Sequence, residues 1–162
     1  MAIEKYYLEL AGEYRVCSEL LKRSLFATIT HGNMKGIDIF AIGDRRRTAV
    51  VEVKASNSNR FVTGLFQKYP DPTMTRPDFW VLYSIRETSE RFDEQFFILS
   101  HDELAAIQAR RNNGGREVSY GEAAARAKKR VDNVLIADVA DYKDQWQKII
   151  DFCQSPKRSR ST

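Results

Sequence analysis

Three charged residues interrupt two apolar segments of the chain, and their types suit the binding of a metal ion. Asp38 lies in "GIDIFAI", and Glu52 and Lys54 lie in "TAVVEVKAS". Side chains alternate along a β-strand, so we expect Glu52 and Lys54 to share one face. If the turn between the segments is symmetric about Arg45, Asp38 lies opposite Glu52. Facing carboxylates repel each other, and a divalent cation between them would reverse that interaction. The pattern therefore favours a metal site.

Plainer interpretations of these charges stay open. Asp38 and Glu52 could meet solvent at the edge of a sheet, and Lys54 could simply form an ion pair with Glu52.

A third acid, Glu13, is predicted to lie on a helix that precedes these strands. Its neighbours at helical spacing are mostly apolar: Leu10, Val16, Cys17 and Leu20. This spacing places Glu13 on the stripe that faces the core. Glu19 instead neighbours basic residues and is expected on the solvated side. The alternative for Glu13 is a partly exposed helix position without a role in the site.

The elements that must position these residues follow from apolar periodicity, turn residues and capping signals. Ser100 with Glu103, and Ser119 with Glu122, have capping-box spacing and predict two helix starts. A long loop, "NSNRFVTGLFQKYPDPTMTRP", is predicted in mid-chain. The predicted strands span residues 25–30, 37–42, 48–54, 78–85, 95–100 and 133–139, the last of them as a strand or an extended segment. The predicted helices span residues 3–23 and 100–111, begin again at 119, and end with 141–152. This order predicts an α/β (mixed α+β) fold with a central mixed sheet of about five strands flanked by helices.

Length and composition favour one globular domain. The chain has 162 residues, of which 43% are hydrophobic and 30% are charged, as in ordinary folded domains. Three of the four units of net positive charge lie near the end of the chain, at Lys157, Arg158 and Arg160. Bulk charge is therefore weak evidence for a partner. We expect one domain over residues 1–155 and a disordered basic tail over 156–162.

Cysteine usage and hydropathy indicate a cytoplasmic protein. Cys17 and Cys153 are far apart in apolar segments and are expected to be small core residues in a reducing compartment. No apolar run approaches the roughly 20 residues that cross a bilayer. The first residues also lack the basic and then apolar order of a signal peptide, so no membrane association is expected.

The sequence resembles the PD-(D/E)XK nuclease superfamily. The resemblance rests on "GID", a hairpin of suitable length and "EVK", preceded by a helix that carries an inward-facing glutamate. Within that superfamily, residues 11–56 are most similar to archaeal Holliday-junction resolvase-like and restriction-endonuclease-like proteins. The likeness becomes vague beyond "DFWVLYSI", and Ile37 stands where the superfamily's name has proline. It implies a restriction-endonuclease-like αβββ core.

The resemblance also implies roles for individual residues. Asp38 and Glu52 would bind Mg²⁺, for which Mn²⁺ would substitute, with the backbone carbonyl of Val53 as a further ligand. Mg²⁺ suits such a site because it commonly uses one or two carboxylates, waters and substrate phosphate. Lys54 would orient the attacking water and stabilise negative charge. Glu13 would hold a metal-bound water or a second ion.

Further residues are weaker candidates for substrate contacts. His31 precedes Asp38, and Arg60, Gln67, Lys68 and Tyr69 lie in the long loop after the E-x-K motif. Long loops are uncommon without a role. Their side chains could contact phosphate or stack on a base, although a solvated loop residue is the simpler interpretation of His31.

Together these features predict a metal-dependent endonuclease that hydrolyses phosphodiester bonds in DNA by means of a metal-activated water. A homodimer would suit this activity, because cutting two strands needs two sites and twofold dimers are the commonest oligomers. The alternative is a noncatalytic nucleic-acid- or protein-binding module that retains the nuclease fold.

Overall fold

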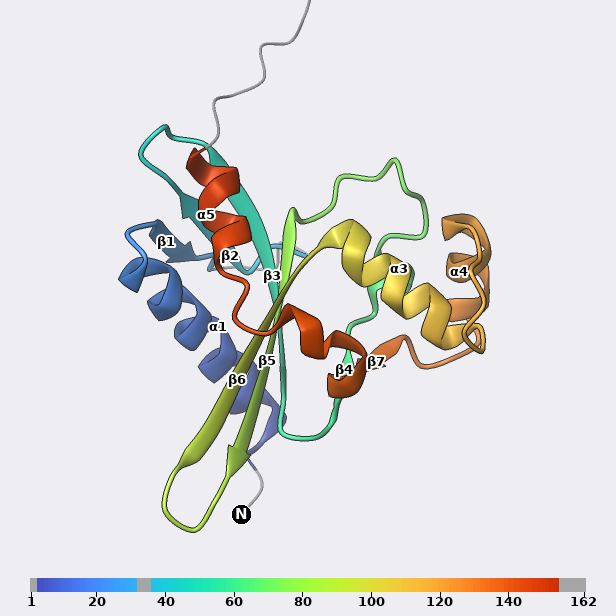
Figure 1. The fold of residues 1–162 in the computed structure, drawn as a ribbon, viewed down its shortest axis with the longest axis horizontal. Coiled ribbons are helices and arrows are strands. Elements are labelled where there is room, and N and C mark those ends of the chain that lie inside the picture. Colours follow the sequence, from blue (N-terminus) through green and yellow to red (C-terminus); the bar gives the residue numbers. More distant parts are fainter. Residues whose placement is uncertain (1–2, 32–35, 155–162) are drawn as a thin grey trace, which may run out of the picture.

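The central feature of the fold is a mixed β-sheet between layers of helices (Figure 1). The structure is a computed structural model and describes residues 3–31 and 36–154. The elements in chain order are α1 (Lys5–Lys22), β1 (Phe26–Ile29), β2 (Ile39–Ile42), β3 (Thr48–Ser56), β4 (Arg60–Val62), α2 (Leu65–Lys68), β5 (Phe79–Glu87), β6 (Phe92–Ser100), α3 (His101–Asn112), α4 (Tyr120–Ala127), β7 (Asn133–Leu135), the 3₁₀ helix η1 (Ile136–Tyr142) and α5 (Gln147–Gln154). The predicted mixed α/β class is confirmed. The basic tail predicted for residues 156–162 lies outside the described residues.

The five strands of the central sheet follow the order β1-β2-β3-β5-β6. The first three strands form an antiparallel meander, β5 joins β3 in parallel, and β6 returns antiparallel to β5. Parallel strands need a crossover connection, and here the crossover contains β4 and α2. The start of the chain therefore has the order αβββ, as predicted.

Helices cover both faces of this sheet. On one face, α1 and α5 pack over a core that includes Val16, Leu20 and Ile149. On the other face, α2, α3 and α4 pack over a second core built around Trp80 and Leu99. In Figure 1, α1 and α5 lie on the left of the sheet and α3 and α4 lie on the right. Ala49, Val51 and Val53 of β3 belong to the first core, so Glu52 and Lys54 share the opposite face of the strand.

Both capping boxes predicted from the sequence are present. The Ser100 hydroxyl accepts a hydrogen bond from Glu103 N at 3.2 Å, and the Glu103 carboxylate accepts one from Ser100 N at 2.8 Å. Ser119 and Glu122 exchange the same pair of bonds at the start of α4. Each box satisfies backbone donors that a helix start leaves free, which explains why both helices begin where they do.

The mid-chain loop contains more structure than the sequence predicts. It includes β4 and the four-residue helix α2, and β4 pairs with β7 in a separate two-stranded sheet. The strand predicted over 133–139 is therefore not part of the central sheet, and most of it forms η1. A strand of three residues is too short to show an apolar alternation. The pairing is also invisible to local patterns, because β4 and β7 are far apart in the sequence.

The predicted exposure of Glu19 is wrong. Its side chain is buried, with a residue exposure of 8%. The carboxylate is kept in place by ion pairs with Arg15, Lys22 and Arg23 on the same helix. Helical spacing identified these neighbours correctly, but the long basic side chains cover the carboxylate instead of leaving it to solvent.

Among the described residues, no helix combines the length and apolar character that a membrane crossing requires.

Candidate active site

The site is located where β3 extends beyond its neighbour β2. The antiparallel register runs from Ile42↔Thr48 to Ile39↔Val51, which is symmetric about Arg45 as predicted. β2 ends there, whereas β3 continues for five more residues to Ser56. From Glu52 onward, β3 therefore has no β2 residue paired beside it, and a notch lies at this edge of the sheet.

A cleft of about 650 Å³ lies at this notch. Its walls come from α1, the end of β3, β4 and α2. Seven charged side chains line it, four of them cationic and three acidic: Lys5, Lys54, Arg60, Lys68, Glu9, Glu13 and Asp38. The cleft thus places a helix acid, the acid ahead of β2 and the lysine of E-x-K around one space.

Glu52 lies behind the wall of this cleft and is completely buried. Its Oε1 atom forms ion pairs with the ammonium groups of Lys54, at 3.3 Å, and Lys68. Its Oε2 atom accepts a hydrogen bond from the Tyr69 hydroxyl at 3.2 Å. A buried carboxylate requires such compensation, because removing a charge from water costs several kcal/mol. The pairing of Glu52 with Lys54, one of the plainer interpretations of the sequence, is therefore present, and it coexists with the cleft.

Asp38 precedes β2 and is fixed by backbone contacts on both sides. Its N–H donates to Val51 O at 3.1 Å, and its Oδ2 atom accepts from Val53 N at 2.7 Å. Burial raises the pKa of the Asp38 carboxyl and the nearby Glu52 carboxylate adds to this, against the lowering effect of the Val53 N–H and of Lys54. Two acids thus approach each other closely enough for one to disfavour ionisation of the other.

Glu13 faces the same cleft from α1. Burial raises the pKa of its carboxyl, with further contributions from the charges of Asp38 and Glu9, while Lys54 acts in the opposite direction. The sequence-based expectation that α1 turns this acid toward the other two is thus supported by its position. Glu13 is only partly buried, so it borders the space instead of closing it.

The two lysines that share Glu52 differ in their electrostatics. Burial acts to lower the pKa of Lys54, but the carboxylates of Glu52 and Asp38 outweigh it, so the pKa is raised. For Lys68, burial and the Lys54 ammonium together lower the pKa despite Glu52. Lys54 therefore holds its proton more firmly than Lys68 does.

The structure separates the weaker substrate-contact candidates. Arg60 and Lys68 line the cleft. His31 is exposed and is not among the described residues that line it, and the exposed Gln67 reaches away, toward the end of α4. Tyr69 is buried against Trp80 and is held by Glu52, so it is not available to stack on a base.

Sequence reasoning missed the residues that hold α2 in place beside the site. Asp132, almost fully buried, accepts hydrogen bonds from the backbone N–H groups of Phe66 and Gln67 at 2.6 and 3.3 Å, and from the Gln108 amide. These bonds hold the start of α2, and α2 in turn carries Lys68 toward Glu52. No local sequence signal links Asp132 to residues more than 60 positions earlier.

A second support passes through His101 to Tyr69. The indole N–H of Trp80 donates to Nδ1 of His101 at 3.1 Å, and Nε2 of His101 lies 3.1 Å from the Tyr120 hydroxyl. That hydroxyl donates to the backbone oxygen of Tyr69 at 2.8 Å. Burial lowers the pKa of His101 to about 4, so the imidazole is neutral, with Nδ1 as acceptor and Nε2–H as donor.

The donor set suits a hard divalent cation. Asp38 and Glu52 offer carboxylate oxygens, the ligands that Mg²⁺ and Mn²⁺ prefer, and the raised pKa of Asp38 reflects surroundings that a cation would improve. In the parts of the chain that the structure describes, no group of three or more His, Cys, Asp or Glu side chains is placed to hold a metal ion. Two carboxylates with water and phosphate oxygens are a common set for Mg²⁺, so the residues fit such an ion, with Lys68 as its competitor for Glu52.

Comparison with known proteins gives no relative: no protein family, curated protein or solved structure matches the chain.

Proposed function

We propose that the protein is a metal-dependent endonuclease that hydrolyses phosphodiester bonds in DNA. The observation that carries this proposal is the convergence of Glu13, Asp38 and Lys54 on one cleft, with Glu52 directly behind Lys54. Two further cations that line the cleft, Arg60 and Lys68, suit a substrate that brings phosphates.

The side chains have distinct tasks in this proposal. Asp38 and Glu52 would hold Mg²⁺ or Mn²⁺, which when bound polarises the phosphodiester and lowers the pKa of a water. Lys54, whose pKa is raised by its acidic neighbours, keeps its charge and stabilises the negative charge that develops on the phosphate oxygens. Glu13, with a raised carboxyl pKa, borders the same space and accepts a hydrogen bond from water. Arg60 neutralises a flanking phosphate.

A specific observation favours a second function, that of a noncatalytic DNA-binding module with the same fold. All the described contacts of the Glu52 carboxylate are cationic or hydroxyl donors, two ammonium groups and one phenol. A carboxylate satisfied in this way is stable without any ion. The two functions therefore differ in whether a divalent cation displaces Lys68 from Glu52.

The test is a cleavage assay with labelled duplex, single-stranded, flap and four-way-junction DNA and with RNA, in Mg²⁺, Mn²⁺ or EDTA. Lys54→Met retains the stem of the side chain and is expected to abolish cleavage while the thermal unfolding transition is preserved. Lys5→Met is the matched control, because Lys5 lines the same cleft but is exposed and pairs only weakly with Glu9. Equal cleavage by wild type and Lys54→Met would refute the mechanism. Metal-independent binding without cutting would establish the binding module.

We further propose a reducing, cytoplasmic location. Both cysteines are free, Cys153 is buried in the core and Cys17 is partly buried, as is usual for proteins that do not rely on disulfides. Thiol titration of unfolded protein that was purified without reductant counts the free cysteines, and two are expected; an oxidised pair would contradict the reducing location.

A further inference from the structure

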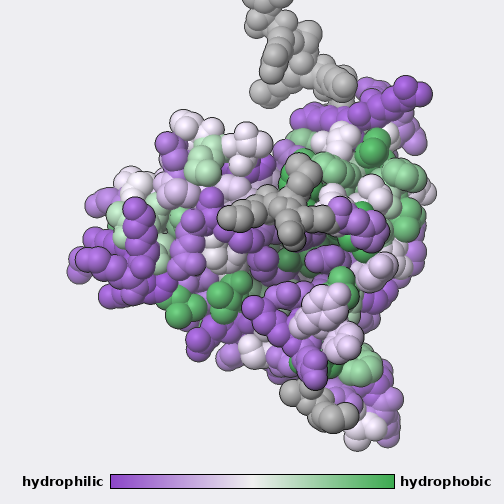
Figure 2. Space-filling view, turned by 180° about the vertical axis from the view of Figure 1, so that it is seen from behind, coloured by the Kyte–Doolittle hydropathy of each residue, from purple (hydrophilic) through white to green (hydrophobic). Residues whose placement is uncertain are grey.

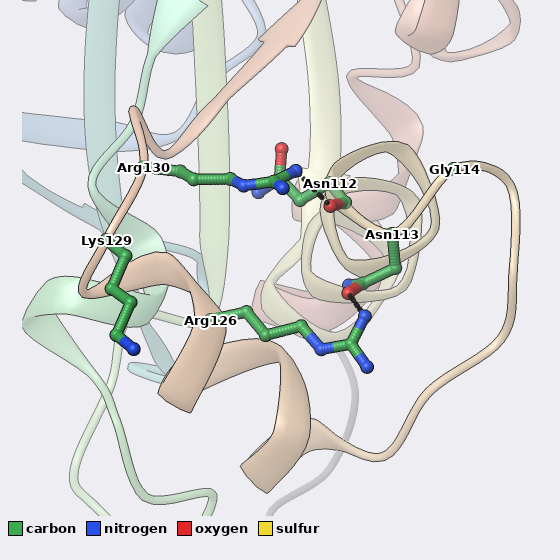
Figure 3. A pocket seen from close by; sticks show the side chains of 6 residues that line it. All are labelled: Asn112, Asn113, Gly114, Arg126, Lys129 and Arg130. Atoms are coloured by element: carbon green, nitrogen blue, oxygen red, sulfur yellow. Dashed lines mark hydrogen bonds between the residues drawn. The ribbon is translucent and has the colours of Figure 1, made fainter.

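A second, basic pocket of about 400 Å³ lies at the far end of the helical layer that covers the Glu52 face of the sheet. Figure 3 shows its walls: Asn112, Asn113 and Gly114 at the end of α3, Arg126 in α4, and Lys129 and Arg130 just after α4. Every charged residue in this lining is a cation. Hydrophilic side chains dominate the end of the molecule at which α4 lies (left in Figure 2).

Within the described part of the chain, the cations of this pocket have no acidic partner. Arg126 donates to the amide oxygen of Asn113 at 2.6 Å, and Arg130 donates to the backbone oxygen of Asn112 at 3.5 Å. Within residues 3–31 and 36–154, no carboxylate forms an ion pair with Arg126, Lys129 or Arg130. Neighbouring arginines behave differently: Arg110 pairs with Glu117 and Arg111 pairs with Asp138 at 3.2 and 2.8 Å. Among the described residues, therefore, no acid pairs with the cations of the pocket, whereas the arginines beside it have acidic partners.

The pocket and the cleft are joined by α2. The Gln67 side-chain amide donates to Ala127 O at 3.3 Å and to Arg130 O at 3.4 Å. The next residue, Lys68, reaches Glu52 and lines the cleft. One short helix thus has the basic segment after α4 on one side and the cleft on the other, so a bound nucleic-acid strand could follow α2 from the pocket to the cleft.

We propose that this basic pocket binds a backbone phosphate of the same nucleic-acid strand that enters the cleft. The inference rests on the proposed function and extends it to a second point of contact. Guanidinium and ammonium groups are the usual partners of phosphate. None of the described residues that line the pocket is aromatic, so no base can stack on them, and the contact positions the strand without reading its sequence.

The test compares DNA binding by two variants that lose the same charge. Lys129→Gln/Arg130→Gln changes the pocket and keeps the Arg126–Asn113 bond. Arg45→Gln/Arg46→Gln changes the exposed turn between β2 and β3, at the end of β3 away from the cleft. Fluorescence anisotropy with a labelled duplex in EDTA measures affinity without cleavage, over a series of salt concentrations. Thermal unfolding checks that both variants are folded.

The expected loss follows from counterion release. Each lost phosphate contact changes the slope of log K against log salt by roughly 0.9, which weakens duplex binding about eightfold at about 0.1 M salt. The pocket variant is expected to show at least one such step and the turn variant none. Equal affinities for wild type and pocket variant, equal losses in both variants, or no duplex binding by the wild type would each overturn the inference.

Two further readouts separate the outcomes. Cleavage by the wild type in Mn²⁺ tests the proposed function alone. If the protein binds DNA through the pocket but does not cut it, the result would support the pocket and refute the nuclease. Calorimetry with inorganic phosphate distinguishes the two sources of this ligand. Free phosphate that binds the wild type but not the pocket variant, while DNA affinity is unchanged, would assign the pocket to a small anion and overturn the inference.

Discussion

Replacing Gly36 by alanine is expected to destabilise the protein by about 2.5–5 kcal/mol, as the sum of a backbone cost and a lost hydrogen bond. Gly36 has a φ of +80°, and a residue with a Cβ atom pays about 1–2 kcal/mol in such a conformation. The added Cβ would also overlap the Tyr69 hydroxyl and lie 3.1 Å from Tyr69 Cζ. Tyr69 would have to move away from Glu52, which loses a hydrogen bond to a charged group worth about 1.5–3 kcal/mol.

A double-mutant cycle isolates the second contribution. Tyr69→Phe alone removes the same hydrogen bond and is expected to cost about 1.5–3 kcal/mol. In Gly36→Ala/Tyr69→Phe that bond is lost only once, and the hydroxyl that meets the new Cβ is absent. The double variant should therefore be more stable than the sum of the single variants predicts, by about the energy of the bond.

Urea unfolding monitored by circular dichroism and tryptophan fluorescence supplies the four free energies. Gly64→Ala is the matched control, because Gly64 also has a positive φ, of +63°, but an added Cβ meets only the Gln67 side chain, at 3.9 Å. It should show the backbone cost alone. Additive single and double variants, or a Gly36→Ala protein as stable as Gly64→Ala, would refute the proposed packing of Gly36 against Tyr69 and Glu52.

Three further perturbations test the supports of the site. Asp132→Ala leaves the Phe66 and Gln67 N–H groups and the Gln108 amide without their acceptor and should cost about 2–4 kcal/mol in urea unfolding; a loss below 1 kcal/mol would contradict this role. Burial lowers the pKa of His101 to about 4 in the folded protein, whereas an unfolded chain has a histidine pKa near 6.5. Between these two pH values the imidazole is protonated in the unfolded state and neutral in the folded state. Stability should therefore fall as the pH drops from about 6.5 to 4, by up to about 1.4 kcal/mol per pH unit, and this dependence should flatten in His101→Gln. Lys68→Met removes an ammonium from Glu52 and should tighten Mn²⁺ binding about tenfold in calorimetry, whereas unchanged affinity would remove Lys68 as the competitor of the metal.

Local signals in the sequence predicted the parts of the site that depend on neighbouring residues. The hairpin register follows from the alternation of apolar residues and the length of the turn, and it placed Asp38 beside the strand that carries Glu52. The inward orientation of Glu13 follows from helical spacing. These features need only a few consecutive residues to specify them, which is why they could be derived before the fold was known.

The other parts of the site depend on contacts between residues that are far apart in the sequence, and local patterns do not predict such contacts. Lys68 and Tyr69 were assigned to a substrate loop, but α2 turns both toward Glu52. The helix has four residues and begins after Gly64 in a left-handed conformation, so it has no recognisable periodicity. Its position depends on Asp132, which is near in space and distant in sequence. Glu19 was misjudged for a different reason, since sequence spacing does not tell whether basic neighbours leave an acid open or cover it.

The pairing of β4 with β7 has a consequence for the order in which the protein folds. The strands of the αβββ segment pair with their neighbours in sequence, so we expect this segment to form early. The α2 segment, however, is held by Asp132 and by the pairing of β4 with β7. These contacts close a loop of more than 60 residues, and forming such long-range contacts is slow. Glu52 is therefore expected to remain hydrated, and able to meet ions, in an early intermediate in which Lys68 and Tyr69 have not yet reached it. Hydrogen exchange pulsed during refolding would show β2 and β3 protected before Phe66 and Gln67.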